Sequence, residues 1–358
     1  MILLREINEN DLDELEGLSR IAAEKHPGFL NLSYDRDQWR EKIQTSIGSF
    51  EGKITHRPST KFIFVAEDLE TGRILGVSMT TAQHGTEDSP HFYFQIDVEK
   101  RMSDSISTGF LHGTLQLHTD TDGPTEIGGL LVNPDFRNSG EHLGRQISFV
   151  RFHFMAMHRP LFKDRVLAEL LPPLTKRGKS PLWEAVGRRF TNMDYVEADV
   201  LSQRDKEFIT ALFPSQKIYV TLLSAEARNA IGKVSKDTEP VMHMLKKIGF
   251  EYLNQVDPFD GGPHLIAPTD KIKPIANTKK YIYNASPNAS AASNTAPQGS
   301  AVLGIVSIDG AKPFRAIAVN AQILPAQPGE LEGITFDPVR ADVIGLNAGT
   351  TVVFTPYY

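Results

Sequence analysis

The sequence contains no cysteine, and this absence excludes several kinds of chemistry at once. Disulfide bonds, thiolate metal sites and a cysteine nucleophile are all ruled out. A chain without cysteine fits a reducing compartment, so we expect a cytoplasmic protein.

Long apolar runs and blocks of positive charge are also missing. No segment approaches the roughly 20 consecutive apolar residues that a membrane helix requires. Within residues 1–15 the apolar part is too short, and the residues after it are too acidic, for a signal peptide. The formal net charge is -6, with no basic block. Neither a membrane nor a nucleic acid is therefore an expected partner.

The chain does have the composition of a folded protein, with 40% hydrophobic and 23% charged residues. Its 358 residues exceed one ordinary core and indicate two or three domains. Apolar periodicity predicts a layered α/β or α+β fold. Strands are expected at 2–7, 61–68, 74–83, 91–98, 126–133, 164–171 and 251–259, and helices at 8–25, 35–50, 143–158 and 181–190.

A glycine-containing loop joins the strand at 126–133 to the helix at 143–158. Free backbone N–H groups before a helix N-terminus bind anions such as the pyrophosphate of coenzyme A, and glycine keeps side chains out of the way. The arrangement resembles GNAT-type acyltransferases, which carry Arg/Gln-x-x-Gly-x-Gly/Ala after their fourth strand. Arg137 and Gly140 fit that pattern, whereas His142 takes its last position. A plain strand-to-helix turn with a glycine cap remains the alternative.

That resemblance implies an acyl-CoA site. In the GNAT fold the fourth and fifth strands splay apart and the thioester lies between them. The backbone N–H groups near Leu130 and Leu131 are then the natural donors to the oxyanion that forms on the thioester. The residues expected to hold acyl-CoA are Leu130, Leu131, Val132, Arg137, Gly140, Leu143 and Gly144.

A more specific resemblance covers residues 1–275. The pattern SPxWxxxGxxFxxMxxxxAD is carried by Ser180, Pro181, Trp183, Gly187, Phe190, Met193, Ala198 and Asp199. Together with "FIFVAEDLETGRILGVS" and "GFEYLNQVDPFDGGPHL", it resembles the arginine N-succinyltransferases. The resemblance implies a GNAT-like enzyme that moves a succinyl group from succinyl-CoA to the α-amino group of arginine, in arginine breakdown. It implies acyl-CoA and an amino acid as partners and no metal, and it leaves a homodimer or hetero-oligomer open.

The chain departs from that family at positions expected to carry chemistry. The family's proton donor is a histidine after a Gly-x-Val triplet, where this chain has Ser235. Serine lacks a pKa near neutrality, so His243 is a candidate substitute, although its segment also fits a helix with a solvent-facing histidine. Gln95 and Leu171 stand where the family tends to have arginines. Arginine is the usual partner of a carboxylate, so the acyl group transferred by this chain can differ from succinyl.

Four carboxylates are further candidates. Glu126, at the start of a strand, is either a base acting through water or a surface charge. Glu169 stands in an apolar run, so it has a partner or faces the cleft. Asp257 and Asp260 either cap a sharp turn or bind a cationic guanidinium. The expected catalytic residues are thus Ser235, His243 and Glu126, and the expected substrate-binding residues are Glu169, Asp257 and Asp260.

Taken together, the sequence predicts a GNAT-like mixed, largely antiparallel sheet flanked by helices. We expect an acyl-CoA-binding domain at 1–200, a second α/β part at 201–275, a linker or exposed loop at 276–300 and a small β subdomain at 301–358. The expected activity is arginine N-succinyltransfer. The alternatives are an acyltransferase with another acyl donor or amine, or a non-catalytic subunit of a succinyltransferase pair.

Overall fold

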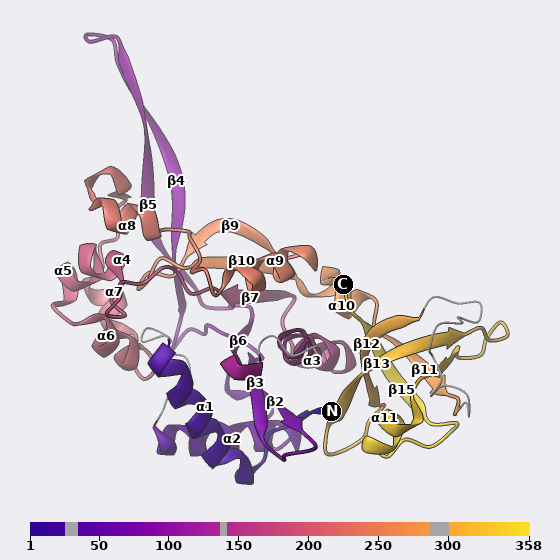
Figure 1. Ribbon diagram of the computed structural model, residues 1–358. Coiled ribbons are helices and arrows are strands. Elements are labelled where there is room, and N and C mark those ends of the chain that lie inside the picture. The colour runs from indigo at the N-terminus through magenta and orange to yellow at the C-terminus, as the bar shows by residue number, and fades with distance from the viewer. Residues whose placement is uncertain (26–34, 137–141, 286–300) are drawn as a thin grey trace.

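The computed structural model describes residues 1–25, 35–136, 142–285 and 301–358. Figure 1 shows helices packed on a sheet, a long two-stranded hairpin projecting to one side and a small β-rich part at the opposite end. The helices are α1 (Leu12–Lys25), α2 (Arg36–Phe50), α3 (Leu143–Met157), α4 (Pro181–Ala185), α5 (Gly187–Thr191), α6 (Tyr195–Ser202), α7 (Glu207–Leu212), α8 (Ala225–Ala230), α9 (Glu239–Lys247), α10 (Lys273–Ala276) and α11 (Pro338–Val343).

The strands of the described residues join into one mixed sheet. They are β1 (Ile2–Glu6), β2 (Lys61–Asp68), β3 (Ile74–Thr81), β4 (His91–Ser103), β5 (Thr108–Asp120), β6 (Thr125–Val132), β7 (Arg165–Glu169), β8 (Ile218–Tyr219), β9 (Glu251–Val256), β10 (Pro263–Pro268), β11 (Lys279–Tyr283), β12 (Val302–Ile308), β13 (Arg315–Leu324), β14 (Gly333–Thr335) and β15 (Thr351–Pro356). The order is β12-β15-β11-β14-β13-β1-β2-β3-β6-β7-β10-β9-β4-β5-β8. Most neighbours are antiparallel, whereas β6 and β7 run parallel. The predicted fold class is confirmed.

The centre of the sheet is buried on both faces. On β2, Phe62 and Phe64 face the core that contains α3, while Ile63 and Val65 face the core under α1 and α2. Each face of a central strand must be covered to remove its apolar side chains from water. The helices α1 and α2 therefore cover one face and α3 covers the other (Figure 1).

Most expected elements are confirmed, with two differences in the helix at 181–190 and the strand at 251–259. The helix breaks into α4 and α5 at Val186, whose φ of -124° and ψ of -77° are not helical. Gly187 follows so close to Trp183 that an added Cβ would come within 2.3 Å of the ring. The strand is followed by an unexpected partner, β10, across the Asp257–Gly262 turn. No helix in the described part of the chain is both long and apolar enough to span a bilayer.

The strand expected at 91–98 is one arm of a much longer hairpin. β4 pairs with β5 over their full lengths, from His91–Asp120 to Ser103–Thr108. The side chains of Glu99, Arg101 and His112 still bond residues of β8 and the turn after it. The tip of the hairpin projects away from the rest of the fold (Figure 1). Its outer part carries exposed apolar side chains, since Val98, Met102, Phe110 and Leu111 are 60–72% exposed.

The C-terminal strands close into a ring. β12, β15, β11, β14 and β13 are neighbours in that order, and an additional pairing of β12 with β13 completes the circuit. The range 276–300 was expected to be a linker, but Lys279–Tyr283 form β11, because alternate residues Tyr281 and Tyr283 are buried in the ring. Residues 286–300 lie outside the described part. The ring is tied to the main sheet by pairing of β13 with β1.

Helix α3 forms the second link between the ring and the main sheet. Its buried His153 makes 2.7 Å hydrogen bonds to the hydroxyls of Thr355 and Ser307, on β15 and β12. Burial lowers the pKa of His153 to about 3, so the imidazole is neutral and serves both hydroxyls. One end of α3 is thus fixed by the ring, while its N-terminus lies at the candidate site.

Candidate active site

The strands β6 and β7 separate soon after they meet. Their parallel pairing is confined to Thr125–Val166 and Glu126–Leu167. On its other side β6 stays paired with β3, with a bulge opposite Val77 and Met79. Gly129 in this bulge has φ +54° and approaches Met79 so closely that an added Cβ would lie 2.7 Å from its Cγ. The splay predicted from the GNAT resemblance is therefore present, and it frees backbone groups of β6 from the sheet.

Helix α3 begins beside the end of β6. His142 precedes it in a left-handed conformation with φ +50°, and its carbonyl accepts bonds from Arg145 and Gln146. Leu143 and Gly144 form the first turn, and a Cβ at Gly144 would lie 3.9 Å from Val132. The N-terminus of a helix this long attracts anions. Arg137 and Gly140 of the expected phosphate loop lie outside the described residues.

The three β6 residues expected to contact acyl-CoA face different sides. Leu131 is buried in the core under α1 and α2, whereas Val132 is buried towards α3. Leu130 is half-buried against the α3 core. Because the side chains pack into cores, the backbone of this segment is what remains for a ligand in the splay.

Glu126 lies at the point where β6 and β7 part. Its Oε2 is 3.0 Å from Nδ1 of His84, a residue that the sequence did not single out as a site residue. Burial alone would raise the pKa of Glu126, but the charge and hydrogen bond of His84 lower it to about 2. Glu126 is therefore an anion, and its side chain is still 22% exposed.

Glu169 lies across the splay among histidines. Its Oε1 is 3.7 Å from Nδ1 of His91 and 3.7 Å from Nε2 of His264, both too long for hydrogen bonds. Burial raises the pKa of Glu169 well above its usual range, and the charges of Glu126 and Asp257 add to that shift. Neighbouring carboxylates thus have opposite preferences, with Glu126 ionised and Glu169 favouring its proton.

The two other histidines of this cluster are neutral. Burial lowers the pKa of His264 to about 3 and takes that of His91 well below its usual range. His264 is fully buried, and neither ring nitrogen has a hydrogen-bond partner among the described residues.

Asp257 and Asp260 cap the turn between β9 and β10. Oδ1 of Asp257 accepts bonds from the backbone N–H of Phe259 and Asp260, and Oδ1 of Asp260 accepts one from Gly262. Burial raises the pKa of both carboxyls, and for Asp260 the charge of Asp257 adds to the effect. The turn-capping interpretation is thus realised, and it occupies one oxygen of each carboxyl.

A fifth carboxylate completes an acidic cluster at this place. Asp199 on α6 has its pKa raised to about 6 by burial and by Asp257. The Nζ of Lys206 donates a hydrogen bond to Pro90 O and faces Glu169, Glu126 and Asp257. Burial lowers the pKa of Lys206. The ammonium groups of Lys42 and Lys61 act on Asp199 and Glu126 as well. The five carboxyls still outnumber these three ammonium groups, so the cluster suits a cationic ligand.

Whether the same residues can bind a metal ion depends on the distances between their ligand atoms. The ligand atoms of His84, His91 and Glu169 lie within 4.8 Å of one another, as do those of Glu169, Asp257 and His264. A tetrahedral zinc ion with bonds of about 2.0–2.1 Å needs ligand atoms roughly 3.4 Å apart. The sequence showed no such grouping because His264 and Glu169 are far from His84 and His91 along the chain.

No hydrogen bond or ion pair among the described residues joins Ser235 or His243 to the cluster of carboxylates and histidines. Ser235 lies beside the end of β7, where its N–H donates to Leu171 O at 2.9 Å, and its hydroxyl is 2.8 Å from that of Thr238. His243 is exposed on α9, as the solvent-facing alternative predicted. Gln95 uses its amide to bond the carbonyls of Leu253 and Asn254.

Arg151 is a buried cation that the sequence did not reveal. It lies on α3, only 2% exposed, and bonds Ser148 and the carbonyl of Gly128 on the bulged part of β6. No carboxylate of the described residues pairs with it, and burial lowers its pKa to about 9. A guanidinium is thus held at the back of the splay with its charge unneutralised.

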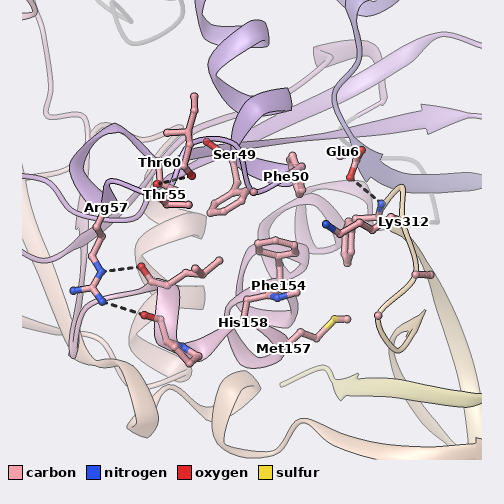
Figure 2. Close-up of a pocket in the computed structure, with 18 residues that line it drawn as sticks. Glu6, Ser49, Phe50, Thr55, Arg57, Thr60, Phe154, Met157, His158 and Lys312 are labelled. Carbon is pink, nitrogen blue, oxygen red and sulfur yellow. Dashed lines mark hydrogen bonds between the residues drawn. The ribbon is translucent and has the colours of Figure 1, made fainter.

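A separate cavity of 340 Å³ lies at the opposite end of α3 (Figure 2). Phe50 and Phe154 form its apolar floor, and Glu6, Arg57 and Lys312 stand at its edge. Because α3 spans about 22 Å, this cavity is remote from the splay. Its lining residues include none from β6 or from the first turn of α3.

Comparison with known proteins gives a consistent result. Residues 2–274 match the family model described as arginine N-succinyltransferase beta subunit. The arginine N-succinyltransferases of Shigella dysenteriae serotype 1 (strain Sd197) and Escherichia coli (strain K12 / DH10B) are each 32% identical over 280 residues, which cover 78% of this chain and 79% of theirs.

A solved structure extends the similarity to the C-terminal ring. The arginine/ornithine succinyltransferase subunit AI from Pseudomonas aeruginosa superimposes with a TM-score of 0.77 at 27% identity, covering 99% of this chain and 98% of that one. The family model and the curated relatives each span well over half of the chain. This chain therefore belongs to the arginine N-succinyltransferase family.

Proposed function

We propose that this chain transfers the succinyl group of succinyl-CoA to the α-amino group of arginine. Family membership supports an acyltransferase, and the acidic cluster beside the β6–β7 splay carries the choice of a cationic amine. The cluster has five carboxyls, and the ammonium groups that act on them are those of Lys206, Lys42 and Lys61. A ligand with a guanidinium and an α-ammonium group supplies the missing positive charge.

Acyl-CoA would enter from the side of α3. The pyrophosphate would lie at the α3 N-terminus near Leu143 and Gly144, and the thioester would reach into the splay. Backbone N–H groups of β6 near Leu130 would then stabilise the oxyanion, since the bulge at Gly129 takes this segment out of the regular ladder. Arg151, behind Gly128, adds a positive charge close to the acyl group.

Arginine would enter from the opposite side, at the Asp257–Gly262 turn. Because Oδ1 of both aspartates is held by the turn, the other oxygens would receive the guanidinium. Their pKa values are raised in the free protein, so a bound cation would restore their ionised state. This leaves the α-amino group directed towards Glu126 and the splay.

A thiol-release assay with paired donors and acceptors tests this function. Succinyl-CoA with arginine should release coenzyme A faster than acetyl-CoA with arginine or succinyl-CoA with citrulline, which lacks the guanidinium charge. Asp257→Asn should raise KM for arginine about tenfold or more and leave KM for succinyl-CoA within about twofold. Equal rates with arginine and citrulline would overturn the cationic-acceptor assignment.

A different acyl donor is a second candidate, favoured by one observation. Gln95 is engaged with backbone carbonyls, and Leu171 offers no charge, so neither replaces a family arginine. The comparison of acyl donors in the same assay distinguishes the two candidates. If no cation binds the terminal carboxylate of the succinyl group, a donor without that carboxylate should react faster.

A partner chain is the third proposal, and it rests on the long β4–β5 hairpin. Two strands alone are marginally stable in water, and this hairpin exposes Val98, Met102, Phe110 and Leu111. We propose that a second chain, identical or related, covers the outer hairpin.

A further inference from the structure

The structure assigns the general base of the proposed transfer to His84, oriented by Glu126. This inference rests on the proposed function and names a residue that the sequence had not. It places the base on a loop after β3 rather than at position 235, where Ser235 bonds Thr238 and the end of β7.

The backbone around His84 is held rigidly. The N–H of His84 donates to Pro124 O at 2.7 Å, and the hydroxyl of Thr125 donates to Ala82 O at 2.8 Å. The loops are so close that a Cβ at Gly123 would lie 1.8 Å from His84 O. A side chain on such a fixed backbone needs little reorganisation before it reacts.

The hydrogen bond to Glu126 selects the tautomer. With Nδ1 donating to the Glu126 carboxylate at 3.0 Å, the Nε2 lone pair is the basic one. The described residues give Nε2 no hydrogen-bond partner, and the His84 side chain is 25% exposed. Glu126 then stabilises the imidazolium that forms when Nε2 takes a proton, so it acts as a positioning residue.

The location suits a base for the acceptor amine. Glu126 marks the last paired position before β6 and β7 diverge, so His84 lies at the inner end of the space where the thioester is expected. The acidic cluster that would hold the guanidinium is adjacent, since the His84 ring packs against His91 with 4.9 Å between ring centroids, and His91 packs in turn against His264 beside Glu169. The dyad thus lies between the two substrate sites.

The proton balance follows directly. The amine enters as an ammonium ion and gives one proton to Nε2 of His84. Its lone pair forms the C–N bond, the C–S bond breaks, and a second amine proton neutralises the departing thiolate. The third stays on the amide nitrogen, and His84 releases its proton to solvent, so each turnover yields one free proton.

The test is chemical rescue in the thiol-release assay, with full-length protein dialysed against a chelator. His84→Ala should lower kcat about 100-fold or more, with KM for succinyl-CoA within about twofold. Added imidazole should restore at least about tenfold of that loss, and it should not stimulate the wild type. Glu126→Gln should lower kcat without becoming sensitive to imidazole, because the base is still present.

A matched control separates chemistry from folding. His118→Ala removes an exposed imidazole stacked on Tyr93 on the neighbouring strand and should keep wild-type kcat. An active wild type whose His84→Ala variant is equally active, or is inactive but not rescued while still binding coenzyme A, overturns the dyad alone. A wild-type chain that releases no thiol with any donor overturns the proposed function and the dyad together.

Discussion

Asp260 shows how a single buried carboxyl links the site to stability. Burial and Asp257 raise its pKa well above the ordinary value of 3.8 in the folded chain. A carboxyl with a raised folded pKa holds its proton more tightly in the folded state, so its contribution to stability is lost as pH rises through that pKa. Without a cationic ligand, Asp260 therefore destabilises the fold at neutral pH.

We expect Asp260→Asn to match the wild type at pH 4 and to be more stable at pH 8 by about 1 kcal/mol or more, since one unit of pKa shift corresponds to about 1.4 kcal/mol. Asparagine keeps the oxygen that accepts from Gly262. Urea denaturation at the two pH values measures the difference. Asp270, whose pKa is lowered by its bond to Arg159, is the control, because Asp270→Asn should bring no gain at pH 8. A difference that does not change with pH would contradict the assignment.

At the same scale, the sequence revealed only part of the site. It predicted roles for Glu126, Glu169, Asp257 and Asp260, because a carboxyl in an apolar or glycine-rich stretch needs a reason to be there, and the structure places these four near one another. It could not group His84, His91 and His264, which come from separate strands and loops and meet only through the sheet. It also missed Arg151, because its burial without a carboxylate partner among the described residues follows from packing and not from sequence spacing.

At the scale of elements, the bulge in β6 is the feature that opens the splay. Gly129 occupies it with φ +54°, against the side chain of Met79. Gly129→Ala should cost about 2–5 kcal/mol of stability, from left-handed strain of roughly 1–2 kcal/mol and overpacking of about 1–3 kcal/mol. Thermal or urea denaturation measures this loss.

Gly72 provides the comparison for that substitution. It has φ +70° in the β2–β3 turn, with nothing within 4 Å of an added Cβ. Gly72→Ala should therefore show the conformational strain alone. If the two variants lose equal stability, Met79 does not confine the bulge.

Secondary structure was predicted correctly where the apolar residues repeat with one clear period. It was missed where a segment becomes a strand only because it pairs with another strand. The β2–β3 hairpin and α3 follow their apolar patterns closely. The outer part of β4 and β5 mixes charged and apolar residues on both faces, so only pairing makes it a strand. β11 is five residues beside a stretch rich in Asn, Ala and Ser, and its order comes from neighbours β15 and β14.

At the scale of the whole molecule, the outer hairpin decides whether the chain acts alone. In the register of β4 with β5, Glu99 faces His112, so Asn-Gly can replace Lys100–Leu111 as a two-residue turn. We expect this shortened chain to be monomeric by light scattering while the wild type associates. Its melting temperature as a monomer should stay close to that of the wild type diluted below association, because the removed residues lie outside the buried cores.

Two outcomes would count against that proposal. A wild type that is monomeric at all concentrations would remove the need for a partner. Equal masses for the wild type and the shortened chain would show association through another surface.

The pairing of β1 between β2 and β13 has a consequence for biosynthesis. Leu3 pairs with Glu67 on one side and with Ile317 on the other. A ribosome therefore delivers β1 long before β13, and one edge of β1 stays without its neighbour until residues 315–324 have been made. The core around β1, β2 and β3 can form early, whereas the link between the main sheet and the C-terminal ring forms only once β13 has left the ribosome.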